Sequence, residues 1–473
     1  MNEINLFGDD RRVTRDGVFN GRPVRYHGEI AATPVSIVSD DDVASGSVVS
    51  TAYLAVSIDG VAVDARRRPV VFVFNGGPIT SSIYLHMLAF GPKRLHVPVD
   101  LDADPASFEV VDNPYTVLDV ADIVCYDPIG TGYSTTGEAT PADRWFSVES
   151  DAAQLREFVR AWLVRHDRLD SPVFLFGESY GTVRAAVAAR QLTEGDASIR
   201  LDGVFLMGQA LNIVETVQRR ENVISYVVSL PTLAALGRYH GVAKPDDTPL
   251  PAFLESVMAY AETTYLNALV KGQQIPQAEL QQVAQRLSEL TGLPAPVFVE
   301  NRLRVGKVPY RQWLFKDAGK VLGGNDGRYL GDAAPDGTPV DPSSVITPAV
   351  EAAHRACLGA LFALPAEAGY RTRSPVTSLD AWRWGATSPF GDWRYGASIA
   401  DAMHARPALR LVVGVGYHDT LTTWGATRYA IRQSDWPLDR VTFRGYFGGH
   451  LAYTVESSLA AMMQDVREWI CTR

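Results

Sequence analysis

A serine at the centre of a glycine-rich turn is the residue of this chain best suited to do chemistry. Ser179 lies in Gly177-Glu178-Ser179-Tyr180-Gly181, a G-x-S-x-G pattern between the apolar run Val173–Phe176 and an Ala-rich helical stretch. On a sharp turn from strand to helix the serine hydroxyl is exposed, and small residues two positions away relieve the crowding. Backbone N–H groups at the helix start favour developing negative charge. Ser179 is therefore predicted to be a nucleophile; the alternative is a turn serine flanked by glycines by chance.

A serine nucleophile needs a base and an acid that orients the base. In proteins with a serine at such a turn, the acid and then the histidine follow later in the chain. Asp419 comes shortly after the apolar run Leu409–Val415, and His450 follows Val441–Tyr446 through a glycine-rich turn. The carboxyl ends of parallel strands form the edge where α/β proteins gather their chemistry. We predict Asp419 as the acid and His450 as the base, with His418 as the rival base.

The segments that would position these residues alternate between strands, turns and helices. Apolar runs of strand length stop at turn signals, and residues at helical spacing follow several of them. The predicted strands are Thr51–Ser57, Val70–Phe74, Ile123–Tyr126, Val173–Phe176, Leu201–Met207, Leu409–Val415 and Val441–Tyr446. The predicted helices between and after them are Val148–Asp167, Tyr180–Leu192 and Ser457–Ile470. This alternation predicts an α/β fold with a mostly parallel central sheet flanked by helices.

The alternation stops after about Asn212, where long helical stretches such as Pro251–Val270 and Gln277–Leu290 begin. One α/β domain split by a helical cap is the economical arrangement. The predicted units are residues 1–212 as the first part of the core, 213–380 as a mainly helical cap insertion and 381–473 as the second part. Gly323–Gly327 lacks the G-K-[ST] ending of a phosphate-binding loop. It is therefore predicted to be an ordinary loop. The aromatic cluster Trp382, Trp384, Phe390 and Trp393 fits either a substrate pocket or core packing.

Composition excludes several classes of protein. The chain has 473 residues, of which 46% are hydrophobic and 21% charged, the balance of a folded globular protein. The 44 Lys and Arg residues against 54 Asp and Glu residues give a net charge of −10. Without a basic surplus or stripe, no nucleic-acid partner is expected.

Location and cofactors are predicted from what the sequence does not contain. No apolar run is long enough to span a bilayer, so we expect no membrane contact. The first residues do not read as a signal peptide, and three sparse cysteines do not make a disulfide framework. We therefore expect a cytoplasmic protein. The sequence has no H-E-x-x-H motif or Cys/His cluster, so neither a metal nor another cofactor is expected.

Several ordered motifs point to one family. They are Asn75-Gly76-Gly77-Pro78 with Ser81-Ser82, Asn113-Pro114-Tyr115, Asp127–Ser134, Gly177–Gly181 and the segments around Asp419 and His450. Together they resemble the motifs of the serine carboxypeptidases of peptidase family S10, most closely its bacterial branch, in the α/β-hydrolase superfamily. The resemblance runs from about residue 50 to residue 470, and it implies an α/β-hydrolase fold.

The resemblance also implies a role for each matching residue. Ser179 would be the nucleophile, His450 the general base and acid, and Asp419 the group that orients His450. The backbone N–H groups of Gly77 and Tyr180 would form the oxyanion hole. A glycine permits close backbone approach, and the residue after the nucleophile sits at a helix start, so this assignment is physically reasonable.

A carboxypeptidase must bind the free C-terminal carboxylate of its substrate. The resemblance implies that Asn75 and Glu178 do so. A glutamate can bind a carboxylate if the two groups share a proton, because like charges in contact raise one pKa. Structural roles remain the alternatives, as a turn-forming Asn75 and as a hydrogen-bonding Glu178 at the elbow.

Departures from the family pattern keep a second function open. The stretch before Gly91-Pro92 has no acid, and Val73, Ile79 and Leu451 replace the usual residues at their positions. The leading hypothesis is a serine carboxypeptidase that cleaves the last peptide bond through an acyl-serine intermediate. The second is an acyltransferase, an esterase or a biosynthetic tailoring hydrolase that acts on an acyl small molecule. A non-catalytic binding protein is the third, and a homodimer is left open.

Overall fold

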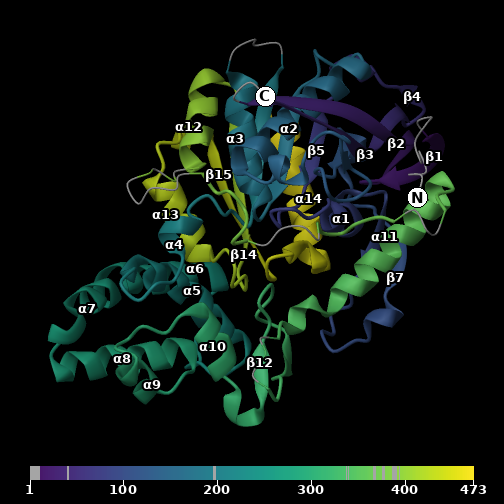
Figure 1. Ribbon diagram of the computed structural model, residues 1–473. Coiled ribbons are helices and arrows are strands. Elements are labelled where there is room, and N and C mark those ends of the chain that lie inside the picture. Colours follow the sequence, from purple (N-terminus) through teal and green to yellow (C-terminus); the bar gives the residue numbers. More distant parts are fainter. Residues whose placement is uncertain are drawn as a thin grey trace.

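The computed structural model describes residues 11–39, 42–194, 199–336, 338, 340–365, 369–374, 379–385, 391, 393 and 395–472. A twisted sheet of eleven strands lies at its centre, with the order β1-β2-β3-β8-β5-β10-β11-β14-β15 (Figure 1). The bounds along this path are β1 (Arg11–Phe19), β2 (Arg22–Ser39), β3 (Asp42–Ile58), β8 (Asp122–Tyr126), β5 (Val70–Phe74), β10 (Val173–Glu178), β11 (Leu201–Met207), β14 (Arg410–Gly416) and β15 (Val441–Tyr446). The short strands β4 (Val61–Ala62) and β9 (Thr135–Thr136) pair with β3.

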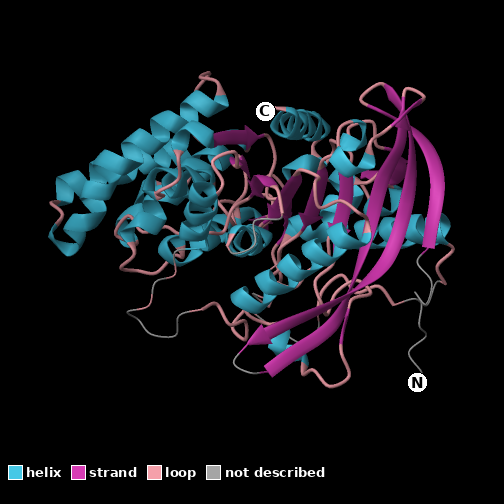
Figure 2. Cartoon of the chain, turned by 90° about the horizontal axis from the view of Figure 1, so that it is seen from above, coloured by secondary structure: helices cyan, strands magenta, loops and turns pink. Residues whose placement is uncertain are grey.

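The sheet is parallel where the chemistry is expected and antiparallel at one end. All neighbours from β8 through β5, β10, β11 and β14 to β15 pair in parallel. Strands β1 to β3 are antiparallel, and β2 and β3 form a long, curved hairpin (Figure 2). Every residue of β5 is buried, as expected for a strand covered on both faces. The predicted fold class, an α/β-hydrolase fold with a mostly parallel sheet, is confirmed.

Helices and short strand pairs complete the chain. The helices are α1 (Ile83–Leu85), α2 (Val148–Arg165), α3 (Gly181–Thr193), α4 (Ile213–Thr216), α5 (Val223–Tyr239), α6 (Leu250–Tyr260), α7 (Leu266–Lys271), α8 (Gln277–Thr291), α9 (Ala295–Glu300), α10 (Lys307–Trp313), α11 (Thr347–Phe362), α12 (Tyr395–Ala405), α13 (Trp424–Gln433) and α14 (Glu456–Cys471). The short pairs are β6 (Lys93–His96) with β7 (Glu109–Asp112), and β12 (Lys320–Leu322) with β13 (Leu330–Asp332). Within the described residues, no helix is both long and apolar enough to cross a membrane.

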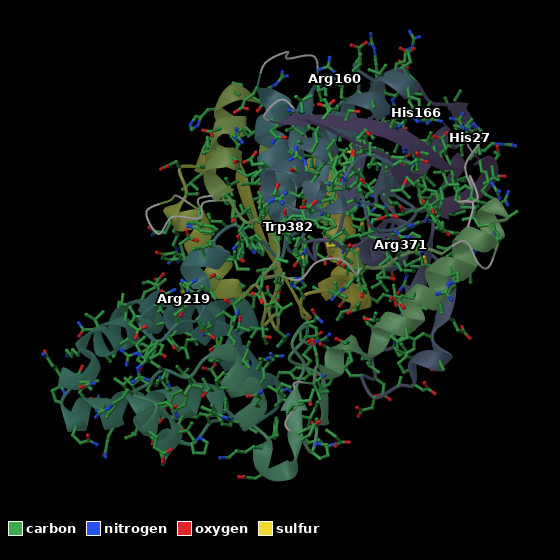
Figure 3. All side chains as sticks on the ribbon, in the orientation of Figure 1. His27, Arg160, His166, Arg219, Arg371 and Trp382 are labelled. Atoms are coloured by element: carbon green, nitrogen blue, oxygen red, sulfur yellow. The ribbon has the colours of Figure 1, made fainter. Side chains whose placement is uncertain are left out.

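Helices cover both faces of the parallel sheet. Alternate side chains of β5 point to opposite faces, so Phe72 belongs to the core that includes α2 and α3, and Val71 belongs to the core that includes α14. Trp382, labelled in Figure 3, belongs to the first of these cores, where its ring meets that of Tyr180 edge-on at 5.3 Å. Trp382 thus serves core packing, while Phe390 of the same predicted cluster lies outside the described residues.

Helices α5 to α10 form a helical layer beside the sheet (Figure 1), and its core continues to Val415 of β14 and Trp424 of α13. Their apolar side chains share a core that includes Leu236, Leu254 and Leu287. Helix α11 behaves differently, although it falls inside the predicted 213–380 insertion. Its Leu358 packs with Ile30 of β2, on the antiparallel end of the sheet. The division into core and cap stays a prediction.

Candidate active site

The turn between β10 and α3 holds Ser179 in a strained backbone conformation. Its φ of 59° lies in the left-handed region, which residues with a side chain seldom adopt. A Cβ on Gly177 would lie 2.3 Å from the carbonyl oxygen of Gly181, so Gly177 is sterically required. Ser179 is partly exposed, whereas its neighbours in the turn are buried. This is the geometry expected of a nucleophile elbow.

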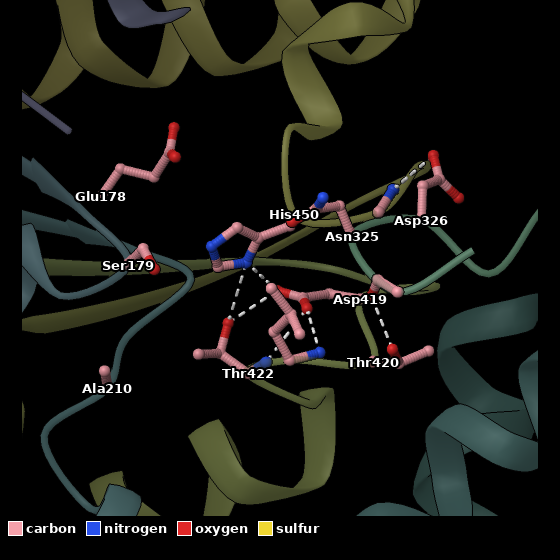
Figure 4. Close-up of polar contacts among 12 residues, drawn as sticks. Glu178, Ser179, Ala210, Asn325, Asp326, Asp419, Thr420, Thr422 and His450 are labelled. Atoms are coloured by element: carbon pink, nitrogen blue, oxygen red, sulfur yellow. Dashed lines mark hydrogen bonds and ion pairs between the residues drawn. The ribbon is translucent and has the colours of Figure 1, made fainter. Parts of the chain in front are cut away.

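Asp419 and His450 meet at the carboxyl ends of β14 and β15. His450 Nδ1 lies 2.7 Å from Asp419 Oδ2, and both side chains are buried (Figure 4). The other carboxylate oxygen, Oδ1, accepts hydrogen bonds from the N–H groups of Leu421 and Thr422 at 2.7 and 3.0 Å. The hydroxyl of Thr422 donates to Oδ2 at 2.6 Å. The carboxylate is therefore held fully hydrogen-bonded, facing the imidazole.

The structure brings His450, and not His418, to Asp419. His418 is buried, and its ring packs edge-on against Tyr239 and Phe447. Burial and nearby cations lower the pKa of His418 to about 3. A histidine held neutral among aromatic rings is a packing residue here.

Ser179 lies beside the His450 ring, and no hydrogen bond joins them in Figure 4. In enzymes without substrate the bond between nucleophile and base is often long and tightens only when substrate binds. The three side chains therefore lie together, and Ser179 is partly exposed.

The glycine-rich loop predicted at 323–327 positions the histidine, a role that the sequence did not suggest. His450 N–H donates to Asn325 O at 2.6 Å, and Gly449 N–H donates to Asp326 Oδ2 at 3.1 Å. Asp326 is in turn paired with Arg328. A Cβ on Gly449 would lie 2.4 Å from Asn325 O, so the two loops are in close contact. Residues 325 and 326 thus hold the backbone that carries the imidazole.

The turn at Asn75–Pro78 packs directly on the elbow. A Cβ on Gly76 would lie 2.5 Å from Tyr180 N, and Gly77 has a φ of 114° that favours glycine. Among the backbone hydrogen bonds of the described residues, neither the Gly77 N–H nor the Tyr180 N–H has an acceptor. Two free donors beside Ser179 are what an oxyanion hole requires.

A buried arginine behind this turn was missed by sequence reasoning. Arg184 of α3 donates to the carbonyl oxygens of Asn75 and Pro78 at 2.8 and 2.9 Å. Its Nε donates to Asp151 of α2 at 2.7 Å, and neither side chain is exposed. An arginine inside an otherwise Ala-rich helix could have indicated a buried ion pair. The sequence does not show which residues are its partners.

Asn75 and Glu178, the predicted carboxylate-binding pair, lie together and are buried. Among the described residues, Asn75 Nδ2 has no hydrogen-bond partner of good geometry, while its Oδ1 accepts from Leu85 N–H at 3.1 Å. Tyr453 donates its hydroxyl to Glu178 Oε2. The Asn75 amide lies near Glu178 and Tyr453 without a well-formed hydrogen bond to either, and a buried donor left so is costly. A carboxylate ligand would provide an acceptor for it.

The protonation of the site is set by burial and by neighbouring charges. Burial raises the pKa of Glu178 to about 7, against the opposing effects of His450 and of hydrogen bonds from Tyr453 and Asn75. Burial also disfavours the charged form of His450. The carboxylate of Asp419, its hydrogen bond and the charge of Glu178 outweigh that effect and raise the pKa of His450 to about 9. The two groups titrate as an interacting pair.

Comparison with known families agrees with the motifs. The family model for serine carboxypeptidases, Peptidase S10, matches residues 57–234. This segment includes the Asn75–Pro78 turn and the elbow, but neither Asp419 nor His450. The resemblance is confirmed for this part of the chain. No curated protein sequence matches the chain.

The chain is also similar to solved structures of distant proteins. A carboxyl esterase from Bacillus coagulans is 14% identical with a TM-score of 0.37, over 93% of this chain and 98% of that one. A proline iminopeptidase from Mycobacterium smegmatis is 12% identical with a TM-score of 0.34, over 93% and 99%. A haloalkane dehalogenase loop variant from Bradyrhizobium elkanii is 13% identical with a TM-score of 0.36, over 93% and 96%. Similarity this distant says nothing about the substrate of this chain.

The site and the family match lead to one conclusion. The strained serine and the hydrogen-bonded Asp419–His450 pair support a serine hydrolase. Residues 57–234 match the serine carboxypeptidase family, and the chain has the α/β-hydrolase fold.

Proposed function

We propose that this protein is a serine carboxypeptidase that removes the C-terminal residue of peptides. The observation that carries the proposal is the buried pair of Asn75 and Glu178 directly beside Ser179. This pair offers an amide donor that makes no well-formed hydrogen bond, although it lies next to Glu178, and a carboxyl group that holds its proton up to about pH 7. Both can donate to a substrate carboxylate, which marks the end of a peptide chain.

The reaction proceeds in two halves. His450 Nε2 takes the proton of Ser179 Oγ, and the oxygen attacks the carbonyl carbon of the last peptide bond. The N–H groups of Gly77 and Tyr180 stabilise the oxyanion. His450 then gives its proton to the departing amine, so the free amino acid leaves and an ester to Ser179 remains. Water, deprotonated by His450, attacks that ester and releases the shortened peptide.

Recognition of the C-terminus is testable with matched peptides. We expect stepwise loss of single residues from peptides with free C-termini and no loss from the same peptides with amidated C-termini. In Asn75→Ala, kcat/KM for free peptides should fall about 10- to 100-fold, since hydrogen bonds to charged groups contribute about 1.5–3 kcal/mol. Mass-spectrometric time courses check the products, and circular dichroism checks that the variant folds.

A substrate without a C-terminal carboxylate is the matched control. Turnover of a small acyl ester should change much less than peptide turnover in Asn75→Ala. Equal cleavage of free and amidated peptides by the wild type would contradict the proposed role of Asn75 and Glu178.

The pH profile should depend on whether the substrate carries a carboxylate. Below about pH 7 both Glu178 and His450 hold a proton, so no base is available. Above about pH 9 both have lost it, and Glu178 repels the substrate carboxylate. We therefore expect kcat/KM for free peptides to be bell-shaped, with limbs near pH 7 and pH 9.

Esters without a carboxylate need only neutral His450, so their kcat/KM should rise with pH through about 9 and should not fall again above it. In Glu178→Gln the negative charge that raises the pKa of His450 is absent, so this rise for esters should move to lower pH. Identical profiles for both substrate types would rule out a role for Glu178 in binding the carboxylate.

A second candidate function is an esterase or acyltransferase on the same site. The stretch before Gly91-Pro92 is apolar and buried, including Met87, Leu88 and Ala89, so it adds no second acid to the carboxylate site. An acyl-enzyme can pass its acyl group to an alcohol or amine in place of water. Product analysis with such acceptors separates the candidates, because a hydrolase gives the free acid under every condition.

A further inference from the structure

Lys307 places a positive charge beside the triad, on the side away from the carboxylate site. It is the first residue of α10 and comes from the cap layer. Its Nζ donates to Leu421 O at 2.8 Å, and Leu421 lies two residues after Asp419. Its backbone N–H donates to Gln218 Oε1 at 2.7 Å, and Gln218 in turn donates to Ser229 Oγ of α5 at 3.0 Å. The lysine is therefore held in place from both ends.

The ammonium group has no anionic partner among the described residues. No carboxylate of these residues lies within ion-pair distance of Nζ. Asp419, the acid whose charge acts on Lys307, already accepts four hydrogen bonds from Leu421, Thr422 and His450. An ammonium group has three donors, and the contact with Leu421 O uses one. Two donors remain for a ligand.

Lys307 lines a pocket that adjoins the triad. The pocket is small, with about 20 Å³ for the centre of a water-sized sphere, which is room for one water or one carboxylate oxygen. Its walls come from the segment after β11, from α5 and from the loop after β14. The lining residues that bear on the argument are Gln209, Ala210, Asn212, Ser229, Lys307 and Thr422. Lys307 is the only charged one of all its lining residues, so the pocket has a positive end.

The position of the pocket identifies which part of a substrate it receives. Figure 4 shows Ala210 and Thr422 on one side of Ser179 and His450, with Glu178 on the opposite side. Glu178 belongs to the site proposed for the terminal carboxylate, which is carried by the leaving residue. The pocket therefore faces the acyl side of the bond that is cleaved.

We propose that Lys307 makes this pocket a subsite for an acidic acyl group, so that the enzyme prefers substrates with a glutamate or another carboxylate before the cleaved bond. The choice of peptides as substrates rests on the proposed function. The preference for an acidic group rests on the position of Lys307. Burial lowers the pKa of Lys307 to about 8, so the ammonium form predominates at neutral pH. A carboxylate that enters the pocket forms a charge-assisted hydrogen bond with it.

The test compares blocked dipeptides that share a C-terminal residue and carry Glu, Gln or Lys before it. The wild type should show kcat/KM at least about tenfold higher for Glu than for the isosteric Gln, a ratio that corresponds to one such hydrogen bond. In Lys307→Met the Glu-to-Gln ratio of kcat/KM should fall to about one. In Lys307→Glu the substrate with Lys before the cleaved bond should have the highest kcat/KM of the three. In Lys316→Met, which removes an exposed lysine of the same layer, the ratio should stay as in the wild type.

Two readouts distinguish recognition from a structural role. The Glu-to-Gln ratio of the wild type should decline as the pH rises through about 8, because the ammonium group loses its proton there. The same comparison can be made with Glu or Gln as the C-terminal residue. Lys307→Met should not change that kcat/KM ratio, because the C-terminal residue binds on the other side of Ser179 from Lys307. A wild-type ratio near one, or a ratio unchanged in Lys307→Met, would overturn the inference while leaving the carboxypeptidase proposal intact.

Esters separate a failure of this inference from a failure of the proposed function. The para-nitrophenyl monoester of adipic acid carries a carboxylate on its acyl chain, and the para-nitrophenyl ester of hexanoic acid does not. Suppose that peptides are not cleaved, but the wild type prefers the adipate ester to the hexanoate ester and Lys307→Met does not. In that case the carboxypeptidase proposal is wrong and the subsite is supported. Absence of turnover for peptides and both esters would overturn both.

Discussion

The Ser179→Ala variant should lose kcat by a factor on the order of 10⁶ on any substrate that the wild type hydrolyses. Without Oγ no acyl-enzyme forms, and only the oxyanion donors and substrate binding remain. The fold should be unaffected, because alanine has the same backbone restrictions at a φ of 59° and the serine is partly exposed. Steady-state assays measure the loss of kcat, and a fluorophosphonate, which forms a covalent bond with activated serines, should label the wild type and not the variant.

Non-additivity is the sharper form of this test. If Ser179 and His450 act as one unit, the double variant Ser179→Ala/His450→Ala should be no slower than either single variant. Ser457→Ala, a change at an exposed serine of α14, is the matched control and should keep wild-type kcat. Multiplicative losses in the double variant, or turnover retained by Ser179→Ala, would show that another residue is the nucleophile.

Replacing Arg184 by methionine should give the largest loss of stability, about 3–5 kcal/mol in the free energy of unfolding. The change leaves the carboxylate of Asp151 buried without its partner, and the carbonyl groups of Asn75 and Pro78 lose their donors. Urea denaturation followed by circular dichroism measures the loss. Arg190→Met, in the same helix but with a surface ion pair, should change stability by less than about 1 kcal/mol.

The double variant Arg184→Met/Asp151→Leu separates stability from positioning. Replacing a buried ion pair by apolar side chains is often neutral, so most of the lost stability should return. Activity should not return, because the Asn75–Pro78 turn still lacks the donors that hold it against the elbow. We expect kcat about 100-fold below wild type, the effect of losing one oxyanion donor. Wild-type kcat in the stable double variant would show that Arg184 stabilises the fold without positioning the turn.

The parallel core could be predicted because its local signals are strong. A strand covered on both faces must be apolar along its whole length, and Val70–Phe74 and Val173–Phe176 are apolar runs that became β5 and most of β10. The helix predicted at Val148–Asp167 is α2, which ends two residues earlier. Strand β1 and the packing of α11 against β2 were not predicted. Amphipathic periodicity shows that one face of an element is buried, but it does not show which element covers that face.

The sequence by itself determined the residues that could react and the ends of the strands that carry them. The G-x-S-x-G turn, Asp419 after one strand and His450 after another are local patterns, and parallel strands align such ends at one edge. The tertiary structure alone decided what holds and surrounds them. Arg184 meets Asn75 across 109 positions, Lys307 meets Leu421 across 114, and Asp326 meets Gly449 across 123. Contacts between residues so far apart depend on how the whole chain packs, and no short stretch of sequence encodes them.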